Sequence, residues 1–353
     1  MCYNHSDEVK TMNMQEVLEQ SRGRMGTWCK SCPVCNGRAC TNHIPGPGAK
    51  GTGTVAIRNY EGWQDVFVNV DTIQDTNAVS TTFELFGKTF KYPIFAGPVG
   101  AVDMHYSDLY TDATYNDALV EGARKAGIAA FTGDGMDDRI MEAATATIQA
   151  QDGIGVPTIK PWPLDIVKAK MELAKQSGAF AVAMDVDAAG LPFLKAFNPP
   201  AGRKGVEELK AIRAMCPVPF IIKGIMSVEG ARKALEAGAD AIVVSNHGGR
   251  VQDGTPSTAS VLPKIAQAVQ GKMKIFVDGG IRTGVDVFKA LALGADGVLV
   301  ARPFVNAVYG AGVQGAQTLV EKLGSELADT MQMCGATDLA SIQASMVETP
   351  AAK

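Results

Sequence analysis

The sequence predicts a (β/α)8 barrel of the TIM type, because eight short apolar runs alternate with helical stretches. Each run ends in glycine or polar residues, and a helical stretch of roughly 10 to 20 residues follows it. The runs lack alternation between apolar and polar residues, which indicates parallel strands buried on both faces. We expect the strands within 93–100, 129–135, 155–161, 179–187, 219–225, 241–247, 274–280 and 297–303.

Two stretches of the chain are near copies of one another and support this architecture. "ARKALEAGADAIVVSNH" and "VFKALALGADGVLVARP" each contain a helix, a Gly-Ala-Asp turn and a strand, so one β/α unit repeats. A doubly wound sheet is the alternative fold. We expect residues 1–90 to form an N-terminal extension that packs on the barrel. Residues 91–353 would form the barrel and C-terminal helices, and the Gly/Pro-rich stretch 42–54 would be a loop.

The composition is that of a folded globular protein, with 46% hydrophobic and 20% charged residues. The net charge of −4 and the scattered lysines and arginines give no footprint for a nucleic acid. No uncharged apolar run approaches the roughly 18 residues of a membrane span. The start, "MCYNHSDEVK", is too polar for a signal peptide. We therefore expect a cytoplasmic protein that neither binds nucleic acid nor spans a membrane.

Many polar residues follow the predicted strands directly. Because TIM barrels carry their active sites at the C-terminal ends of the strands, these positions should meet at one rim. A structural ion pair explains any single one of them, but a face built for stability alone has no reason to gather them all. The positions are Gly97, Gly100, Thr132, Lys160, Asp185, Asp187, Lys223, Ser245, His247, Arg250, Asp278, Gly280, Arg282 and Arg302.

The last two strands carry a phosphate signature. "DGGIRTGVD" places two glycines after a strand and an arginine at the start of the next helix. Glycines let backbone N–H groups approach an anion, and a helix N-terminus favours negative charge. With Arg282 and Arg302 beside the glycines, the sequence predicts a bound phosphate group.

Four motifs together resemble the FMN-dependent α-hydroxy acid oxidase and dehydrogenase family, which includes glycolate oxidase and lactate oxidase. They are "IIKGI", "SNHGGR", "DGGIRTGVDVFKALALGADGVLVARP" and "DLASIQ". The resemblance runs from Lys88 to Met346 and is most specific over 219–303. It implies FMN at the mouth of a TIM barrel and oxidation of a small L-2-hydroxy carboxylate, such as lactate or glycolate, to the 2-oxo acid. It also implies a homo-oligomer, a tetramer in many members.

The resemblance also assigns residues to the cofactor. Lys223 would contact the flavin where the reduced ring becomes anionic. We further expect Lys160 and Asp185 beside the flavin, although the family usually has other residues there. The phosphate and ribityl chain would be held by Asp278, Gly280, Arg282, Ala301 and Arg302, and the ring would be lined by Ala96, Gly97, Pro98, Gly100, Thr132 and Ser245.

The catalytic residues implied by the resemblance are His247, Asp187, Lys223 and Arg250. An imidazole with a pKa near neutrality suits the base that accepts a substrate proton. Asp187 matches the carboxylate partner of this histidine. Arg250 can grip the substrate carboxylate through two parallel N–H bonds. Whether the base takes the hydroxyl proton or the carbon proton stays open.

The sequence departs from the family around the substrate. No arginine aligns in the loop 188–203 with the family's second carboxylate-binding arginine, for which Arg203 is a candidate. "TIKPW" replaces the usual glutamine and tyrosine of the third strand, where Trp162 would pack. Tyr60 is a candidate for the N-terminal tyrosine that holds substrate. The flavin residues are therefore as expected, whereas the residues around the substrate differ.

Four cysteines, Cys29, Cys32, Cys35 and Cys40, form the run "CKSCPVCNGRAC". Four thiolates can bind an iron–sulfur cluster or Zn²⁺, and His43 is a candidate to replace one ligand. Free or redox-active thiols are the third possibility. The run favours a dehydrogenase that passes electrons to an electron-transfer protein over one that uses O₂, although both acceptors stay open.

Three other functions are open at this stage. One is a diverged flavoprotein, with or without an iron–sulfur cluster, that acts on a different substrate class. Another is a redox-sensing or electron-carrying protein whose cysteine run is the working part. The last is a phosphate-binding barrel without flavin, which Lys223 and the "SNHGGR" motif disfavour.

Overall fold

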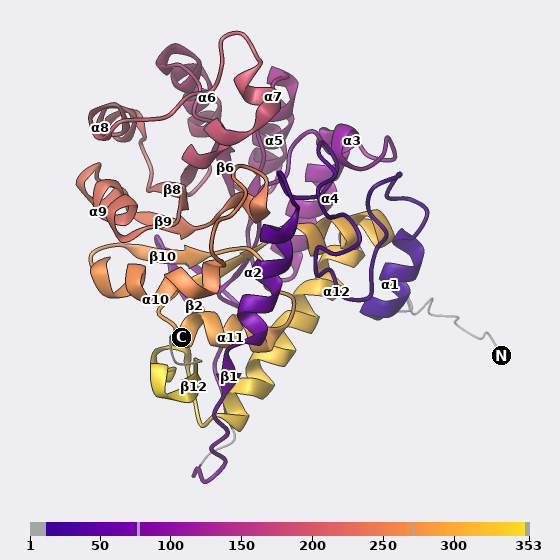
Figure 1. The fold of residues 1–353 in the computed structure, drawn as a ribbon, viewed down its shortest axis with the longest axis vertical. Helices are drawn as coiled ribbons and strands as arrows, with labels where there is room; N and C mark the ends of the chain where they lie inside the picture. Colours follow the sequence, from indigo (N-terminus) through magenta and orange to yellow (C-terminus); the bar gives the residue numbers. More distant parts are fainter. Residues whose placement is uncertain (1–11, 76–77, 270, 350–353) are drawn as a thin grey trace, which may run out of the picture.

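The computed structural model, which describes residues 12–75, 78–269 and 271–349, contains a closed barrel of eight parallel strands (Figure 1). The last barrel strand pairs with the first, so the predicted (β/α)8 barrel is confirmed and the alternative of an open doubly wound sheet is wrong. The strands are β4 (Ile94–Ala96), β5 (Ala130–Thr132), β6 (Gly155–Ile159), β7 (Val182–Asp185), β8 (Phe220–Ile225), β9 (Ala241–Val244), β10 (Lys274–Val277) and β11 (Gly297–Val300).

The strand residues are buried on both faces, as the continuous apolar runs predict. Only Gly224 and Lys274 are partly exposed. Side chains that point into the barrel form an apolar cluster of their own, and the opposite faces of the strands pack against the helices. The interior cluster includes Phe95, Phe131, Val156, Ile221, Phe276 and Leu299.

A β-hairpin covers one end of this interior. It consists of β2 (Phe83–Leu85) and β3 (Lys88–Phe90), which pair in antiparallel fashion. The rings of Phe83 and Phe90 lie 6.1 and 5.2 Å from the ring of Phe95, with near-perpendicular planes. The hairpin lies on the extension side of the predicted boundary at residue 90, yet its side chains belong to the interior cluster of the barrel. The boundary itself stays a prediction.

One long helix follows each barrel strand. Hydroxyl or carboxylate caps begin several of them, as at Thr111, Asp137, Ser227 and Thr283. The helices are α4 (Asp112–Lys125), α5 (Asp138–Ala150), α6 (Leu164–Gln176), α8 (Val206–Met215), α9 (Val228–Glu236), α10 (Thr258–Val269), α11 (Gly284–Ala292) and α12 (Arg302–Met333). Short helices lie in the loops that follow the C-terminal ends of the barrel strands: α3 (Val102–His105), η1 (Val186–Gly190), α7 (Pro192–Lys195) and η2 (His247–Gly249).

The two ends of the described chain lie on the outside of the barrel (Figure 1). α1 (Met14–Ser21) packs along α12, and α2 (Thr54–Gln64) packs against α10 and η2. The short strands β1 (Phe67–Val68) and β12 (Val347–Glu348) pair with each other. Residues 22–53 form neither helix nor strand, which includes the predicted loop.

The C-terminal segment differs from the expected pattern of helices. α12 begins at Arg302, inside the range 297–303 expected for the last strand, and bends at Ala311 and Gly312. "DLASIQASMV" forms the 3-10 turns η3 (Leu339–Ser341) and η4 (Ala344–Met346). Among the helices of the described residues, none has the length and apolar character needed to cross a membrane.

Truncation of Phe95 should destabilise the barrel strongly. Its ring is fully buried and contacts the rings of Phe83, Phe90, Phe131 and Phe276. We expect Phe95→Ala to lower the free energy of unfolding by about 3–5 kcal/mol, measured by urea denaturation. The matched control is Phe67→Ala, whose ring is 60% exposed and should change stability little. Equal losses in the two variants would contradict the role of the interior cluster.

Candidate active site

A cavity of about 1100 Å³, including its open mouth, lies at the C-terminal ends of the barrel strands. Most of the residues predicted from the sequence line it: Pro98, Gly100, Lys160, Lys223, His247, Arg250, Asp278, Gly280, Arg282, Ala301 and Arg302. Ala96, Gly97, Thr132, Asp185, Asp187 and Ser245 are not in the described lining, although they lie at the same strand ends. The structure therefore brings most of the predicted residues to one end of the barrel.

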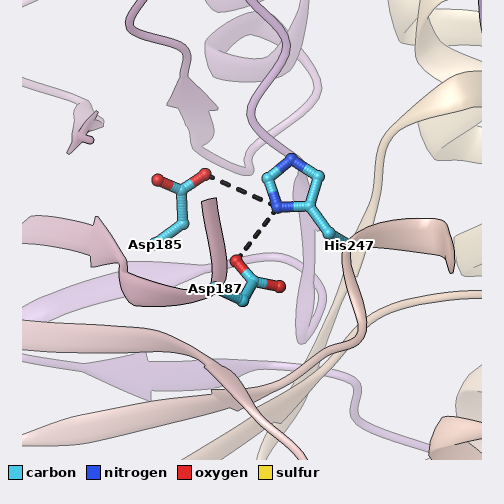
Figure 2. A group of neighbouring side chains, drawn as sticks. All are labelled: Asp185, Asp187 and His247. Carbon is cyan, nitrogen blue, oxygen red and sulfur yellow. Dashed lines mark hydrogen bonds and ion pairs between the residues drawn. The ribbon is translucent and has the colours of Figure 1, made fainter. Parts of the chain in front are cut away.

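His247 follows β9 and is held by carboxylates on one side of its ring. Its Nδ1 lies 3.0 Å from Oδ1 of Asp187 and 3.9 Å from Oδ2 of Asp185 (Figure 2). The backbone N–H of His247 donates to Oγ of Ser245 at 3.1 Å. The residue has a φ of 55°, a left-handed conformation that is uncommon for histidine and recurs at functional sites. Because Nδ1 is hydrogen-bonded to Asp187, Nε2 is the nitrogen available to a bound ligand.

The surroundings of His247 keep its ring neutral at pH 7. Burial lowers the pKa of His247 well below its ordinary value, and the cations Lys223 and Lys160 lower it further, whereas Asp185 opposes the shift. A neutral imidazole hydrogen-bonded to a carboxylate through Nδ1 has its lone pair on Nε2. The ring can therefore accept a proton on the side away from Asp187.

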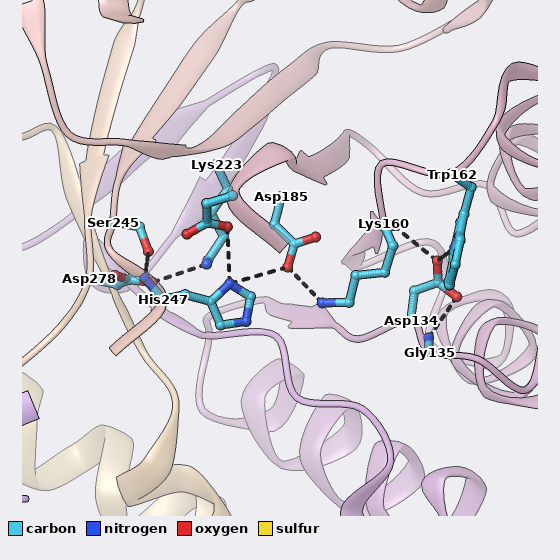
Figure 3. Close-up of polar contacts among 10 residues, drawn as sticks. Asp134, Gly135, Lys160, Trp162, Asp185, Lys223, Ser245, His247 and Asp278 are labelled. Atoms are coloured by element: carbon cyan, nitrogen blue, oxygen red, sulfur yellow. Dashed lines mark hydrogen bonds and ion pairs between the residues drawn. The ribbon is translucent and has the colours of Figure 1, made fainter. Parts of the chain in front are cut away.

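Two buried lysines place positive charge beside the histidine (Figure 3). Nζ of Lys160 lies 2.8 Å from Oδ2 of Asp185, and Nζ of Lys223 lies 3.6 Å from Oδ2 of Asp278. Burial by itself would lower the pKa of Lys223, but Asp187, Asp278 and Asp185 raise it overall. Lys223 is thus a fixed cation at the end of β8, where it can stabilise negative charge that develops on a ligand.

Asp134 organises the neighbouring strand ends, a role that sequence reasoning missed. Its carboxylate accepts hydrogen bonds from the backbone N–H of Lys160 at 3.0 Å and from Nε1 of Trp162 at 2.8 Å (Figure 3). It also accepts one from Nζ of Lys170 at 3.0 Å. Trp162 is thus a hydrogen-bond donor as well as a packing residue. The position of Asp134, two residues after β5, was a signal that could have found it.

The far end of the cavity is cationic and rich in glycine. Gly279 and Gly280 have φ of 83° and 89°, and a Cβ on Gly280 would lie 2.1 Å from the carbonyl oxygen of Asn59. Nε of Arg282 donates to the carbonyl of Cys35 at 2.6 Å, while its buried Nη2 has no hydrogen-bond partner among the described residues. Together with Arg302, which also lines the cavity, these groups suit an anion such as phosphate.

The guanidinium of Arg250 already donates three hydrogen bonds to backbone carbonyls. Its Nη1 donates to the carbonyls of Gly46 and Gly48 at 2.5 and 3.1 Å, and its Nη2 donates to that of Pro45 at 3.3 Å. A guanidinium has five N–H groups, so two of them stay available to a ligand. Burial lowers the pKa of Arg250 to about 10, which leaves it charged at pH 7.

The two candidates for missing substrate contacts do not reach the cavity. Arg203 is exposed, and neither it nor Tyr60 belongs to the described lining. Tyr106 and His105 line the cavity instead. The remaining wall is apolar and is formed by Met104, Met136, Leu191 and Phe193. These residues lie on or next to the rim helices α3 and α7 or in the loop after β5, whose positions the sequence pattern does not predict.

The four cysteines of the predicted metal site line a second, smaller cavity of about 380 Å³, including its open mouth. Pro47, Tyr106 and Arg302 line both cavities, so the two are neighbours. His43 is not among the described lining residues, and its ring stacks 4.6 Å from that of Trp28. All four cysteines are free thiols. Burial raises the pKa of Cys29 to about 12, helped by the charges of the other three thiols.

The electrostatics of His247 lead to a prediction that NMR can test. We expect the His247 ring in the folded protein to stay neutral down to a pH below 6.5, because burial and two lysines oppose its protonation. In the urea-unfolded chain the same ring should titrate near ~6.5. A ring with a depressed pKa in the folded state also makes the protein lose stability as pH falls below the unfolded pKa. Titration of folded His247 at or above 6.5 would contradict this account.

The comparisons with known proteins agree with the geometry. The family profile of FMN-dependent dehydrogenases matches residues 46–193 and 198–349. A 4-hydroxymandelate oxidase of Amycolatopsis orientalis is 31% identical over 84% of this chain and 92% of its own length. An L-lactate oxidase of Lactobacillus jensenii is 31% identical over 72% of this chain and 68% of its own length.

A solved structure of mandelate oxidase with (S)-2-phenylpropionate superposes with a TM-score of 0.74. It is 27% identical in sequence, and the match covers 95% of this chain and 97% of that one. The fold, the strand-end site and the sequence relatives therefore agree: the chain belongs to the family of FMN-dependent dehydrogenases, which includes the α-hydroxy acid oxidases.

Proposed function

We propose that the chain oxidises a small L-2-hydroxy carboxylate of the lactate type to the 2-oxo acid, with His247 as the proton acceptor. One observation carries this proposal. Nδ1 of His247 is bound to Asp187, while Nε2 stays free on a ring that lines the cavity. The apolar wall of Met104, Met136, Leu191 and Phe193 favours a substrate with an apolar side chain over glycolate.

The residues at the strand ends fit FMN. The unpartnered Nη2 of Arg282, together with Arg302 and Gly280, suits its phosphate, and the unpartnered Oγ1 of Thr132 and Oδ1 of Asp278 are further sites for its polar atoms. Lys223 would face the part of the ring that becomes anionic on reduction. When bound, FMN supplies the two-electron acceptor for the substrate.

The histidine and its partners would divide the proton chemistry as follows. Nε2 of His247 accepts a proton from the substrate, and the resulting imidazolium gains stability from Asp187 at Nδ1. Asp185 adds a second carboxylate 3.9 Å from the same nitrogen. Because Lys160 is paired with Asp185, the pair adds little net charge, and Asp187 stays the main partner of the imidazolium.

Two cations are available for the carboxylate of the substrate. Arg250 retains two N–H groups after its bonds to the loop carbonyls. Lys160 retains donors beyond its bond to Asp185, and it lines the cavity. We infer that Lys160 takes over part of the binding that the family's second arginine provides.

The electron acceptor, the oligomeric state, the cellular location and a metal at the cysteine run are also part of the proposal. The electron acceptor is O₂ or an electron-transfer protein, and the oxidase relatives make O₂ plausible. A homo-oligomer, the cytoplasmic location and a metal at the cysteine run likewise stay predictions.

An anaerobic spectrum tests the proposed reaction. L-lactate, glycolate and (S)-mandelate are added in turn to protein loaded with FMN, and the flavin absorbance is followed. We expect L-lactate to bleach it, and His247→Ala to slow bleaching about 100- to 10,000-fold while FMN stays bound. Bleaching by none of the acids would contradict the function, and bleaching of His247→Ala at the wild-type rate would contradict the role of His247.

The role of Arg250 in binding the substrate carboxylate can be tested with Arg250→Lys, which keeps the positive charge but loses the planar guanidinium group. We expect the KM for the hydroxy acid to rise about 10- to 100-fold, with a smaller change in kcat. Arg58→Lys is the control, because its guanidinium donates to the carbonyl of Thr255 and lies outside the described lining of the cavity. An unchanged KM in Arg250→Lys would remove Arg250 from the substrate site.

A further inference from the structure

The cysteine cavity, lined by Cys29, Cys32, Cys35 and Cys40, is unexplained by the flavin chemistry described above. The four residues belong to a segment without helix or strand, yet all of them reach one space of about 380 Å³. The thiols are not joined in disulfides. Four thiols that line one space offer the sulfur ligands that iron–sulfur clusters and Zn²⁺ use.

The backbone of the run is bent so that the thiols converge. Ser31, between the first two cysteines, has a left-handed φ of 43°. Gly37, between the last two, has a φ of 84°, and Thr41, directly after the last cysteine, has a φ of 34°. Such a conformation is uncommon for serine and threonine, and it persists where the surrounding structure has a use for it. The run is therefore shaped around the cavity.

The rest of the protein contacts this run at its start and in its middle. Sγ of Cys29 donates to Oδ1 of Asn306 on α12 at 3.3 Å. The carbonyl of Cys35 accepts from Nε of Arg282 at 2.6 Å. Arg302 lines both the cysteine cavity and the larger cavity. The thiols thus lie directly behind the arginines that suit the cofactor's phosphate.

The spacing of the cysteines along the chain separates two kinds of metal site. Structural zinc sites commonly place two C-x₂-C pairs far apart in the sequence. Cys29, Cys32 and Cys35 instead follow one another as C-x₂-C-x₂-C, the spacing of the first three cysteines in the iron–sulfur run of bacterial ferredoxins.

We propose that Cys29, Cys32, Cys35 and Cys40 bind an iron–sulfur cluster in the cysteine cavity, next to the phosphate end of the flavin site. The cluster binds through the four thiolates, and each thiol loses its proton to water as it binds iron. The binding site stands on the geometry alone; its use in electron transfer rests on the proposed function.

In this proposal the cluster carries the electrons that the oxidation releases to a carrier protein. Oxidation of one 2-hydroxy acid to the 2-oxo acid releases two electrons and two protons. A cluster in which one iron changes between ferric and ferrous passes on one electron at a time. Two such cycles would deliver both electrons to a one-electron carrier protein, while both protons go to water.

The test is the metal content of the full chain purified without oxygen. Iron, acid-labile sulfide, zinc and FMN are measured per chain, and the dithionite-reduced protein is examined by EPR. We expect iron and sulfide in equal amounts, with an EPR signal of a reduced cluster. Cys32→Ser and Cys35→Ser should lose most of the iron and sulfide. Cys334→Ser, which removes a buried thiol elsewhere, should keep both.

Three results would overturn the proposal: zinc in place of iron, no iron even after incubation with ferrous iron and sulfide, or full iron content in both serine variants. Circular dichroism checks that the serine variants are folded. If they are not, the iron and sulfide content of the wild-type protein tests the proposal by itself. Adding L-lactate to the wild-type protein separates the two proposals. If L-lactate bleaches the flavin of a protein that contains no iron, only the proposed cluster is contradicted. If the protein contains iron and its flavin is not bleached, only the proposed reaction is contradicted.

Discussion

The structure depends on the pairing of charges that the closed barrel brings to one rim. Eight parallel strands end at the same edge, so the side chains of Lys160, Asp185, Asp187, Lys223 and Asp278 lie close together and are at most 13% exposed. Burying an unpaired charge costs several kcal/mol, and each of these groups therefore needs an opposite charge or a hydrogen-bond partner. Asp187 fixes the ring of His247 through Nδ1, while burial and the cations Lys223 and Lys160 lower its pKa. Stability and chemistry thus impose one arrangement on these side chains.

The segment before the barrel completes the site. Asn59 on α2 exchanges two hydrogen bonds with Asn246, the neighbour of His247, at 2.7 and 2.9 Å. The loop 45–48 supplies carbonyls to Arg250, and the cysteine run supplies one to Arg282. Both arginines are therefore positioned by residues far away in the sequence.

Much of this architecture could be predicted from the sequence, because strand ends are local features. Apolar runs followed by polar residues identified the barrel, and the motif around His247 identified its rim. The hydrogen bonds of Asp134, the apolar wall at Phe193 and the loop contacts of Arg250 could not be found in this way. They depend on where loops from distant strands come to lie. The shared wall of the two cavities at Arg302 depends on the packing of residues 22–53, which carry no periodic pattern.

In the proposed reaction, Nε2 of His247 faces the hydroxyl group of a bound 2-hydroxy acid beside FMN. This arrangement can be tested by a crystal structure of the protein with FMN and a slowly reacting 2-hydroxy acid. We expect the hydroxyl oxygen within hydrogen-bond distance of Nε2, the acid's carboxylate at Arg250 or Lys160, and the FMN phosphate at Arg282 and Arg302. A bound acid whose hydroxyl group makes no contact with His247, or a flavin bound elsewhere, would contradict it.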